Sequence, residues 1–331
     1  GGVEPSTPDP VTTIRATEIR GHLRFWWRAT RGGQFKTIEE LKAKEDEIWG
    51  TAAKFDKDGK VISGPSKINI EVFDATFEQE QKAYKVIITG IDQEGQKTYK
   101  TVYQLKKIAP EYFIFPLKPE QKDIKEFGTS TPIKSIYVGV SFNVKLIYPD
   151  IISKDIEASL WAWENFGGIG ARTRRGFGAI KYLYNNNELP PSSALEFSDW
   201  ISQKCNTHII DKHNIDNLPT LSNNLDFSII SPKDTSLQVW NILSDILKNF
   251  RSKIDDTPFR KKDVDAIRNL FRNKNYKTNV HHFQRSYLGL PIAYQNLKGI
   301  YRSGKKIEKA SLHGKQQQRL ASPVILRPIA C

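Results

Sequence analysis

The chain comprises 331 residues, of which 38% are hydrophobic and 26% charged, and its formal net charge is +13. This length suffices for two domains with hydrophobic cores, and the lack of any run of about 18 apolar residues argues against a membrane span. The two cysteines lie far apart in the sequence. That spacing argues against a disulfide framework and favours the reducing environment of the cytoplasm.

The positive charge is concentrated in three segments. Residues 15–36, 167–181 and 298–319 contain six basic residues against one acid, four against none, and seven against one. Clusters of this kind are typical of a nucleic-acid footprint rather than of a generally basic surface. The sequence therefore predicts a polyanionic partner, with single-stranded RNA as the candidate, and no membrane partner.

The first predicted element is a helix over residues 17–31. Four apolar residues fall on one face at helical spacing: Ile19, Leu23, Trp26 and Trp27. Four arginines form a second row: Arg20, Arg24, Arg28 and Arg31. Within this segment only Glu18 opposes them, so we expect the apolar face to lie in the core and the basic row to be exposed and to bind RNA phosphates.

Further elements are predicted between this helix and residue 153. A charged, helix-prone stretch covers residues 37–49. Alternating or β-branched runs predict strands at 67–74, 83–91, 98–106, 112–117 and within 133–148. The polar sequence Asp-Gln-Glu-Gly between the second and third of these runs predicts a long β-hairpin.

A glycine- and arginine-rich loop is predicted at residues 166–178, after a helix over 154–166 and before a strand over 177–184. It holds five glycines, three arginines and no acid. Glycine lets a backbone approach a bulky partner, and the arginine fork fits phosphate oxygens. We therefore predict that the loop binds RNA through Gly167, Gly168, Gly170, Arg172, Arg174, Arg175, Gly176, Phe177 and Gly178. The order differs from that of nucleotide-binding loops, which run from strand to helix.

A polar, proline-containing segment, Asn185–Ser193, predicts a linker between two domains, residues 1–186 and 194–331. In the second domain the patterns predict strands at 225–230 and 320–326 and helices at 234–252 and 262–272. No strict internal repeat is present.

The sequence offers few candidate catalytic residues. His22 lies among the arginines and is the candidate acid or base for RNA cleavage. Cys205, His208 and His213 suggest a partial zinc site, but a fourth ligand is not apparent. The sequence thus predicts no metal, no cofactor and no enzyme activity.

Several motifs together resemble one protein family. The segment Ile19–Ala29 resembles the first-helix signature of the RAMP (repeat-associated mysterious protein) subunit that opens the Cmr module, subunit one of the type III-B CRISPR effector. Residues 166–178 resemble the glycine-rich loop of that family. Residues 288–292 and 319–325 are similar to its C-terminal motifs.

This resemblance implies an α+β fold of two tandem ferredoxin-like (RRM-like, β-α-β-β-α-β) domains with a long β-hairpin insertion, in which the first strand of the first domain is missing. It implies a cytoplasmic, non-catalytic subunit that binds CRISPR RNA, target RNA or both near the 3′ side of the guide, together with other Cmr RAMP subunits, in antiviral defence. The alternative is a metal-independent RAMP endoribonuclease that processes CRISPR RNA, with His22 at the scissile phosphate.

Overall fold

The computed structural model describes residues 14–51, 57–58, 64–183, 191, 193–212, 214–215, 218–223, 235–253, 269, 292–295, 301–302, 305–306, 309–312 and 325–326. The chain forms two compact units, Gly1–Trp240 with Arg327–Cys331, and Asn241–Leu326. The domain boundary expected at Asn185–Ser193 stays a prediction, because most of that segment lies outside the described residues. The fold mixes helices with small antiparallel sheets, so the α+β class is as expected.

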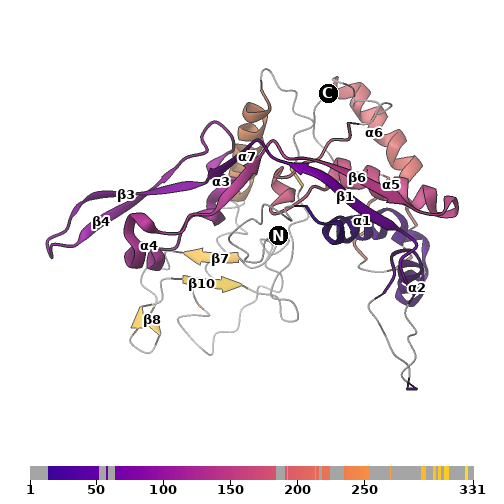
Figure 1. Cartoon of the computed structure of the whole chain (residues 1–331), viewed down its shortest axis with the longest axis horizontal. Coiled ribbons are helices and arrows are strands. Elements are labelled where there is room, and N and C mark those ends of the chain that lie inside the picture. Colours follow the sequence, from indigo (N-terminus) through magenta and orange to yellow (C-terminus); the bar gives the residue numbers. More distant parts are fainter. Residues whose placement is uncertain are drawn as a thin grey trace. The chain divides into compact units, whose positions relative to one another are not determined.

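Two helices pack against each other to form the main core. These are α1 (Ala16–Arg31) and α5 (Ser153–Phe166), and Figure 1 shows them close together. The predicted apolar face of α1 is buried, with Ile19, Leu23 and Trp27 at 0% exposure. The Trp27 indole N–H donates to Asp155 of α5 at 2.8 Å, so the largest buried side chain of α1 also has its polar atom satisfied.

A second helix, α2 (Ile38–Trp49), lies against α1. Thr37 caps its start by accepting the backbone N–H of Glu40 at 3.1 Å, which is the usual role of threonine at this position. The helix ends at Gly50, whose φ of 76° is a conformation that glycine adopts without strain. The helix predicted at residues 37–49 is therefore confirmed.

A two-stranded ribbon crosses α1. Strand β1 (Asn69–Thr76) pairs antiparallel with β6 (Ser141–Ile147), and β2 (Gln79–Lys82) pairs with β5 (Ser135–Val138). Between β2 and β5 the chain forms the predicted long hairpin, β3 (Tyr84–Ile91) and β4 (Lys97–Tyr103), which is drawn as an extended arm in Figure 1. These strands confirm the β-rich middle of the first half.

The strand predicted at residues 112–117 is wrong. The chain forms a helical turn there, α3 (Glu111–Ile114), followed by a 3₁₀ turn at Phe115–Leu117. Phe113 and Ile114 are both 0% exposed, which an alternating strand with one buried face would not allow. Pro116 also lacks the N–H that a strand needs for its ladder. A short helix, α4 (Gln121–Phe127), follows.

The strand predicted at residues 177–184 is also wrong, because residues 177–183 form no strand. Phe177 turns inward and packs on a second hydrophobic cluster, which is formed by Ala83, Tyr84, Tyr103, Leu105, Ala109 and Ile114. The next residue, Gly178, has a φ of 57°, which interrupts an extended backbone.

Besides the short α4, the sequence patterns missed a longer helix, α6 (Ala194–His208). Ser193 caps its start, since its hydroxyl accepts the Glu196 N–H at 3.2 Å and donates to the Glu196 carboxylate at 2.7 Å. A serine followed three residues later by glutamate was therefore the signal that could have revealed it. The helix predicted at 234–252 is confirmed as α7 (Ser236–Lys253).

The described residues of the second unit include four short strands. β7 (Ile292–Gln295) pairs with β10 (Lys309–Leu312), and β8 (Tyr301–Arg302) pairs with β9 (Lys305–Lys306). The elements predicted at 225–230, 262–272 and 320–326 lie wholly or largely outside the described residues. Among the helices that the structure describes, none combines the length and apolar character needed to cross a bilayer.

Candidate nucleic-acid interface

The glycine- and arginine-rich loop begins where α5 meets α1. A Cβ at Gly167 would lie 2.6 Å from both Trp163 Cδ1 and Trp26 Nε1, distances that real Cβ atoms do not show. The next residue accepts a hydrogen bond, because the Trp163 indole N–H donates to the Gly168 carbonyl at 3.0 Å. The buried faces of the two helices therefore fix the point from which the loop leaves.

The loop closes on itself through glycine backbone contacts. The Ile169 N–H donates to the Gly178 carbonyl at 2.9 Å. A Cβ at Gly178, which has a φ of 57°, would lie 1.8 Å from the Ile169 carbonyl oxygen. Inside this closure Arg172 is left-handed, with a φ of 63°, and Thr173–Arg175 form a 3₁₀ turn that ends at Gly176. The glycines thus set the loop geometry that carries the arginines.

The closed loop is tied to the first turns of α1. The Gly170 N–H donates to Glu18 Oε1 at 3.1 Å, and the His22 imidazole lies 3.8 Å from the same oxygen. The His22 side chain foremost, and then the Gly170 N–H, lower the pKa of Glu18, although partial burial opposes them. His22 also stacks on Trp163, with 6.0 Å between ring centroids. The loop therefore contacts α1 through Glu18 and His22.

The loop arginines are half-exposed, and their backbone is held from the other side. The Trp240 indole N–H, from the start of α7, donates to the Arg175 carbonyl at 2.7 Å. The Trp240 ring packs against Phe177, with 4.6 Å between centroids. Phe177 thereby anchors the loop to the second hydrophobic cluster, and Arg172, Arg174 and Arg175 are the side chains that the loop can present to a polyanion.

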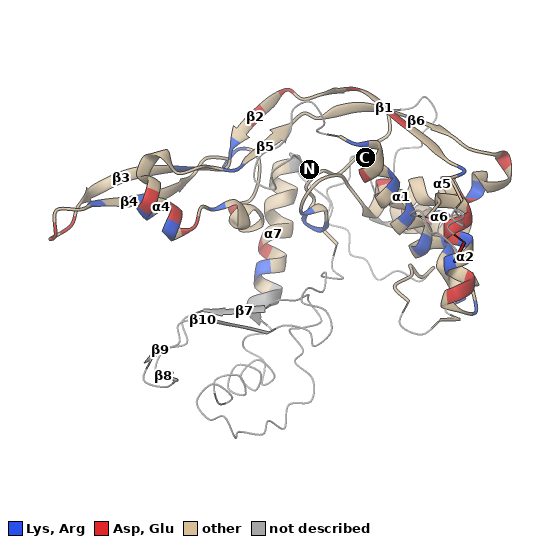
Figure 2. Cartoon of the chain, turned by 60° about the horizontal axis from the view of Figure 1, so that its bottom comes forward, with Lys and Arg blue, Asp and Glu red and all other residues tan. Residues whose placement is uncertain are grey.

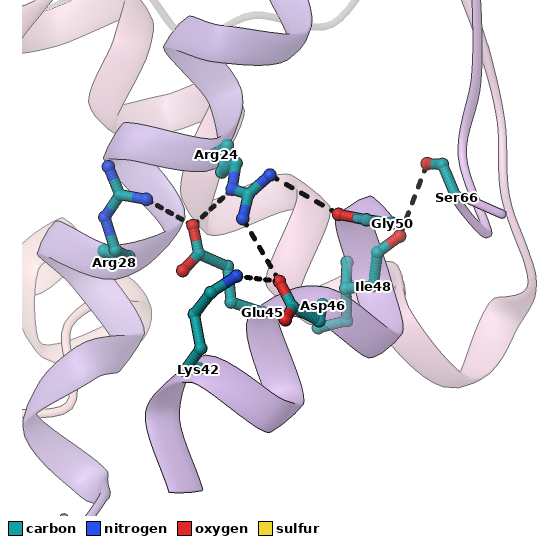
Figure 3. Close-up of polar contacts among 8 residues, drawn as sticks. All are labelled: Arg24, Arg28, Lys42, Glu45, Asp46, Ile48, Gly50 and Ser66. Atoms are coloured by element: carbon teal, nitrogen blue, oxygen red, sulfur yellow. Dashed lines mark hydrogen bonds and ion pairs between the residues drawn. The ribbon is translucent and has the colours of Figure 1, made fainter. Parts of the chain in front are cut away.

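Two arginines of the α1 row face acids that the local sequence does not reveal. Glu45 of α2 accepts hydrogen bonds from both Arg24 and Arg28, as Figure 3 shows. Arg24 also lies 3.3 Å from Asp46 and donates to the Gly50 carbonyl at 3.4 Å. The Glu45 side chain is only 5% exposed. The expectation that Glu18 alone opposes this row is therefore wrong, and Figure 2 shows acidic and basic positions together where α1 meets α2.

The other two arginines of the row have different surroundings. Arg31 is 9% exposed and donates to the Lys154 carbonyl at 2.7 Å, and burial lowers its pKa. Arg20 is half-buried and donates to the Ile68 carbonyl at 3.2 Å. The expected exposure of the whole row is wrong for Arg31, whereas RNA binding by the row stays a prediction.

The partial zinc site does not come together in the described residues. Cys205 is 1% exposed, and burial raises the pKa of its thiol to about 11. His208 stacks on Trp161, and burial lowers its pKa to about 4. His213 lies outside the described residues. Where the structure describes the chain, no three His, Cys, Asp or Glu side chains gather as metal ligands.

One known protein family matches the part of the chain that holds these features. The model of the RAMP superfamily matches residues 1–181, which is more than half of the chain and includes both α1 and the glycine- and arginine-rich loop. The chain belongs to the RAMP superfamily. The matched region ends within a few residues of the loop, so the interface between loop and α1 lies inside the RAMP region.

Individual relatives carry related names. The chain is 29% identical to the CRISPR system Cmr subunit Cmr1-2 of Pyrococcus furiosus over 170 residues, which is 50% of this chain and 81% of that protein. It is similar to the crystal structure of Cmr1 from Pyrococcus furiosus in the apo form (19% identity, TM-score 0.39, 74% of this chain and 69% of that one). It is also similar to a chain in a cryo-EM structure of the Type III-B Cmr-beta bound to cognate target RNA (21% identity, TM-score 0.34, 62% and 59%).

The sequence reasoning missed the roles of Glu45 and Trp240 in this RAMP-superfamily site and the pairing of Glu18 with His22. Glu45 gives no local signal, because its partners lie on another helix. Trp240 lies in the helix predicted at 234–252, and its contact with the loop joins residues 65 positions apart. The pair of Glu18 and His22 could have been found, since residues four apart on a helix are neighbours.

Proposed function

We propose that this RAMP-superfamily chain is a non-catalytic, RNA-binding subunit of a type III-B CRISPR effector. In this role it would contact CRISPR RNA, target RNA or both near the 3′ side of the guide, together with neighbouring Cmr subunits in the cytoplasm. The family membership and the Cmr1-2 relative support the effector assignment. The clustered basic residues support RNA as the ligand.

The observation that carries the RNA-binding proposal is the meeting of the closed loop with α1. Single-stranded nucleic acids bind basic grooves that follow the backbone phosphates. The loop places three half-exposed arginines on a backbone with exposed glycine at position 170. We assign phosphate contacts to Arg172, Arg174 and Arg175 of the loop and to Arg20, Arg24 and Arg28 of α1. Because Arg31 points to Lys154 and Asp155, we assign it to packing.

We further propose that the first half is ferredoxin-like. The order α1, β1, β6, α5 follows the central α-β-β-α part of that fold, with β1 and β6 antiparallel. The β3–β4 hairpin would then be an insertion between the two central strands. A second ferredoxin-like domain at 194–331 is proposed on the family resemblance alone.

The first test is the salt dependence of RNA binding. If the chain binds through phosphates, the logarithm of its affinity should fall with the logarithm of salt concentration by about 0.7 per phosphate contact. Arg174→Glu should weaken binding and flatten this slope by at least one such step. The matched control is Lys125→Glu on the exposed face of α4, which changes the net charge equally. Fluorescence anisotropy with labelled oligoribonucleotide measures both. An affinity that is independent of salt would contradict the proposal.

The second candidate function, a metal-independent endoribonuclease, is favoured by the position of His22. Its imidazole lies 3.8 Å from Glu18 beside the loop, an acid–base pair next to the proposed RNA site. We expect the purified chain, incubated with guide or target RNA and a chelator, to bind RNA without cutting it. His22→Ala should leave any background cleavage unchanged. Specific cleavage that disappears in His22→Ala would establish the nuclease and reject the non-catalytic role.

A further inference from the structure

A pocket lies at the foot of the β1–β6 ribbon, beside α1. It has a volume of about 570 Å³, within the roughly 300–1,000 Å³ of small-ligand sites. Its walls come from α1, the segment that leads into β1, and the residues at the end of β6. The lining residues are Arg20, Ser66, Lys67, Ile68, Asn69, Ile147, Tyr148 and Pro149. Two cations and no acid line it, so the pocket favours an anion.

The Arg20 side chain and the backbone that carries Lys67 are held in place by hydrogen bonds within the chain. Arg20 donates one of its five N–H groups to the Ile68 carbonyl, at 3.2 Å, which orients the guanidinium. The segment that carries Lys67 is fixed to the end of α2, because the Lys67 N–H donates to the Ile48 carbonyl at 3.1 Å. Ser66 donates to the same carbonyl at 3.5 Å (Figure 3).

The two cations are not equivalent. The Lys67 ammonium lies 2.6 Å from Glu47, which neutralises part of its charge. Arg20 has no acidic partner among the described residues, and its planar fork suits a phosphate. Arg20 is therefore the principal anion contact of the pocket.

Tyr148 supplies the second feature that a nucleotide requires. It follows β6 directly, is half-exposed, and shares the pocket wall with Ile147 and Pro149. Aromatic rings bind unpaired bases by stacking, and an amide such as that of Asn69 can hydrogen-bond a base or a ribose. An aromatic ring, an amide and an arginine in one pocket match the base, the sugar and the phosphate of one nucleotide.

We propose that this pocket binds one nucleotide unit of the RNA strand, with the phosphate against Arg20 and the base against Tyr148. The inference rests on the proposed RNA-binding function. α1 carries both Arg20 and the contacts to the loop, so the same helix holds the pocket residue and the loop in place.

The experiment compares two variants with their matched controls by anisotropy, using a labelled oligouridylate. Tyr148→Ala should raise the dissociation constant about tenfold, the size of one lost base–aromatic stack, whereas Tyr148→Phe keeps the ring and should bind as the parent chain does. Arg20→Gln should flatten the log–log salt slope by about 0.7. Lys145→Gln, an equal charge change on exposed β6, should leave the slope unchanged. Thermal melts check that all variants are folded.

The outcomes separate this inference from the proposed function. If Tyr148→Ala and Arg20→Gln bind RNA as the parent does while Arg174→Glu binds more weakly, the pocket assignment is rejected and the RNA-binding function stands. If adenosine monophosphate binds, is lost in Arg20→Gln and is not displaced by RNA, the pocket takes a free nucleotide and the proposal is overturned. If the parent chain binds no RNA, both fall.

Discussion

Replacing Arg24 and Arg28 together by alanine is expected to lower the free energy of unfolding by about 3–5 kcal/mol, the usual cost of removing the partner of a buried charge. Glu45 accepts hydrogen bonds from both arginines and is only 5% exposed. Without them its carboxylate would stay inside the contact between α1 and α2 with no cation beside it. Urea denaturation followed by circular dichroism measures the change.

Two controls isolate this effect. Adding Glu45→Ala to the double variant removes the stranded carboxylate and should recover most of the lost stability. Lys42→Ala breaks the ion pair between Lys42 and Asp46. Because the Lys42 side chain is 49% exposed, this change should lower the free energy of unfolding by less than about 1 kcal/mol. A double variant as stable as the parent would mean that the arginines serve only as an exposed basic surface.

Gly178→Ala is expected to lower the free energy of unfolding by about 2–4 kcal/mol and to weaken RNA binding. The left-handed φ of 57° costs an alanine about 1–2 kcal/mol, and the new Cβ at 1.8 Å from the Ile169 oxygen forces apart the hydrogen bond that closes the loop. The opened loop would no longer hold its three arginines in the same positions. Thermal melts and RNA titrations on one preparation measure both effects.

Gly170→Ala is the matched control for this change. Gly170 has a similar positive φ of 79°, but a Cβ there would meet nothing within 4 Å. It should therefore show only the conformational cost of about 1–2 kcal/mol. Equal losses in the two variants would mean that loop closure contributes nothing beyond backbone strain.

The sequence by itself determined the elements whose signals are local. The spacing of Ile19, Leu23 and Trp27 predicted α1 and its buried face, and the alternation on either side of a polar turn predicted the β3–β4 hairpin. The same holds for the composition of the loop, which singled out the glycines and arginines before any contact was known. Such signals can be read from the sequence because helix and strand periodicity depend on neighbouring residues in the chain.

Local pattern failed where packing with distant residues overrode it. Phe113 and Ile114 read as part of a strand, yet both side chains are buried side by side in a helical turn. Phe177 also read as the start of a strand, but the Trp240 ring and the second hydrophobic cluster draw it inward. Propensity is a weak guide wherever burial against other elements contributes more free energy.

Only the tertiary structure decided what the charged residues do. Arg24 and Glu45 are 21 positions apart, and Glu18 and Gly170 are 152 apart, so no window of the sequence contains either pair. Charge composition counts the arginines of α1 as one basic row, whereas folding gives Arg24 and Arg28 a shared acidic partner, buries Arg31 beside Asp155 and leaves Arg20 at a pocket. Hydrogen bonds and ion pairs form only between groups a few ångströms apart, and the fold alone sets which charges come that close.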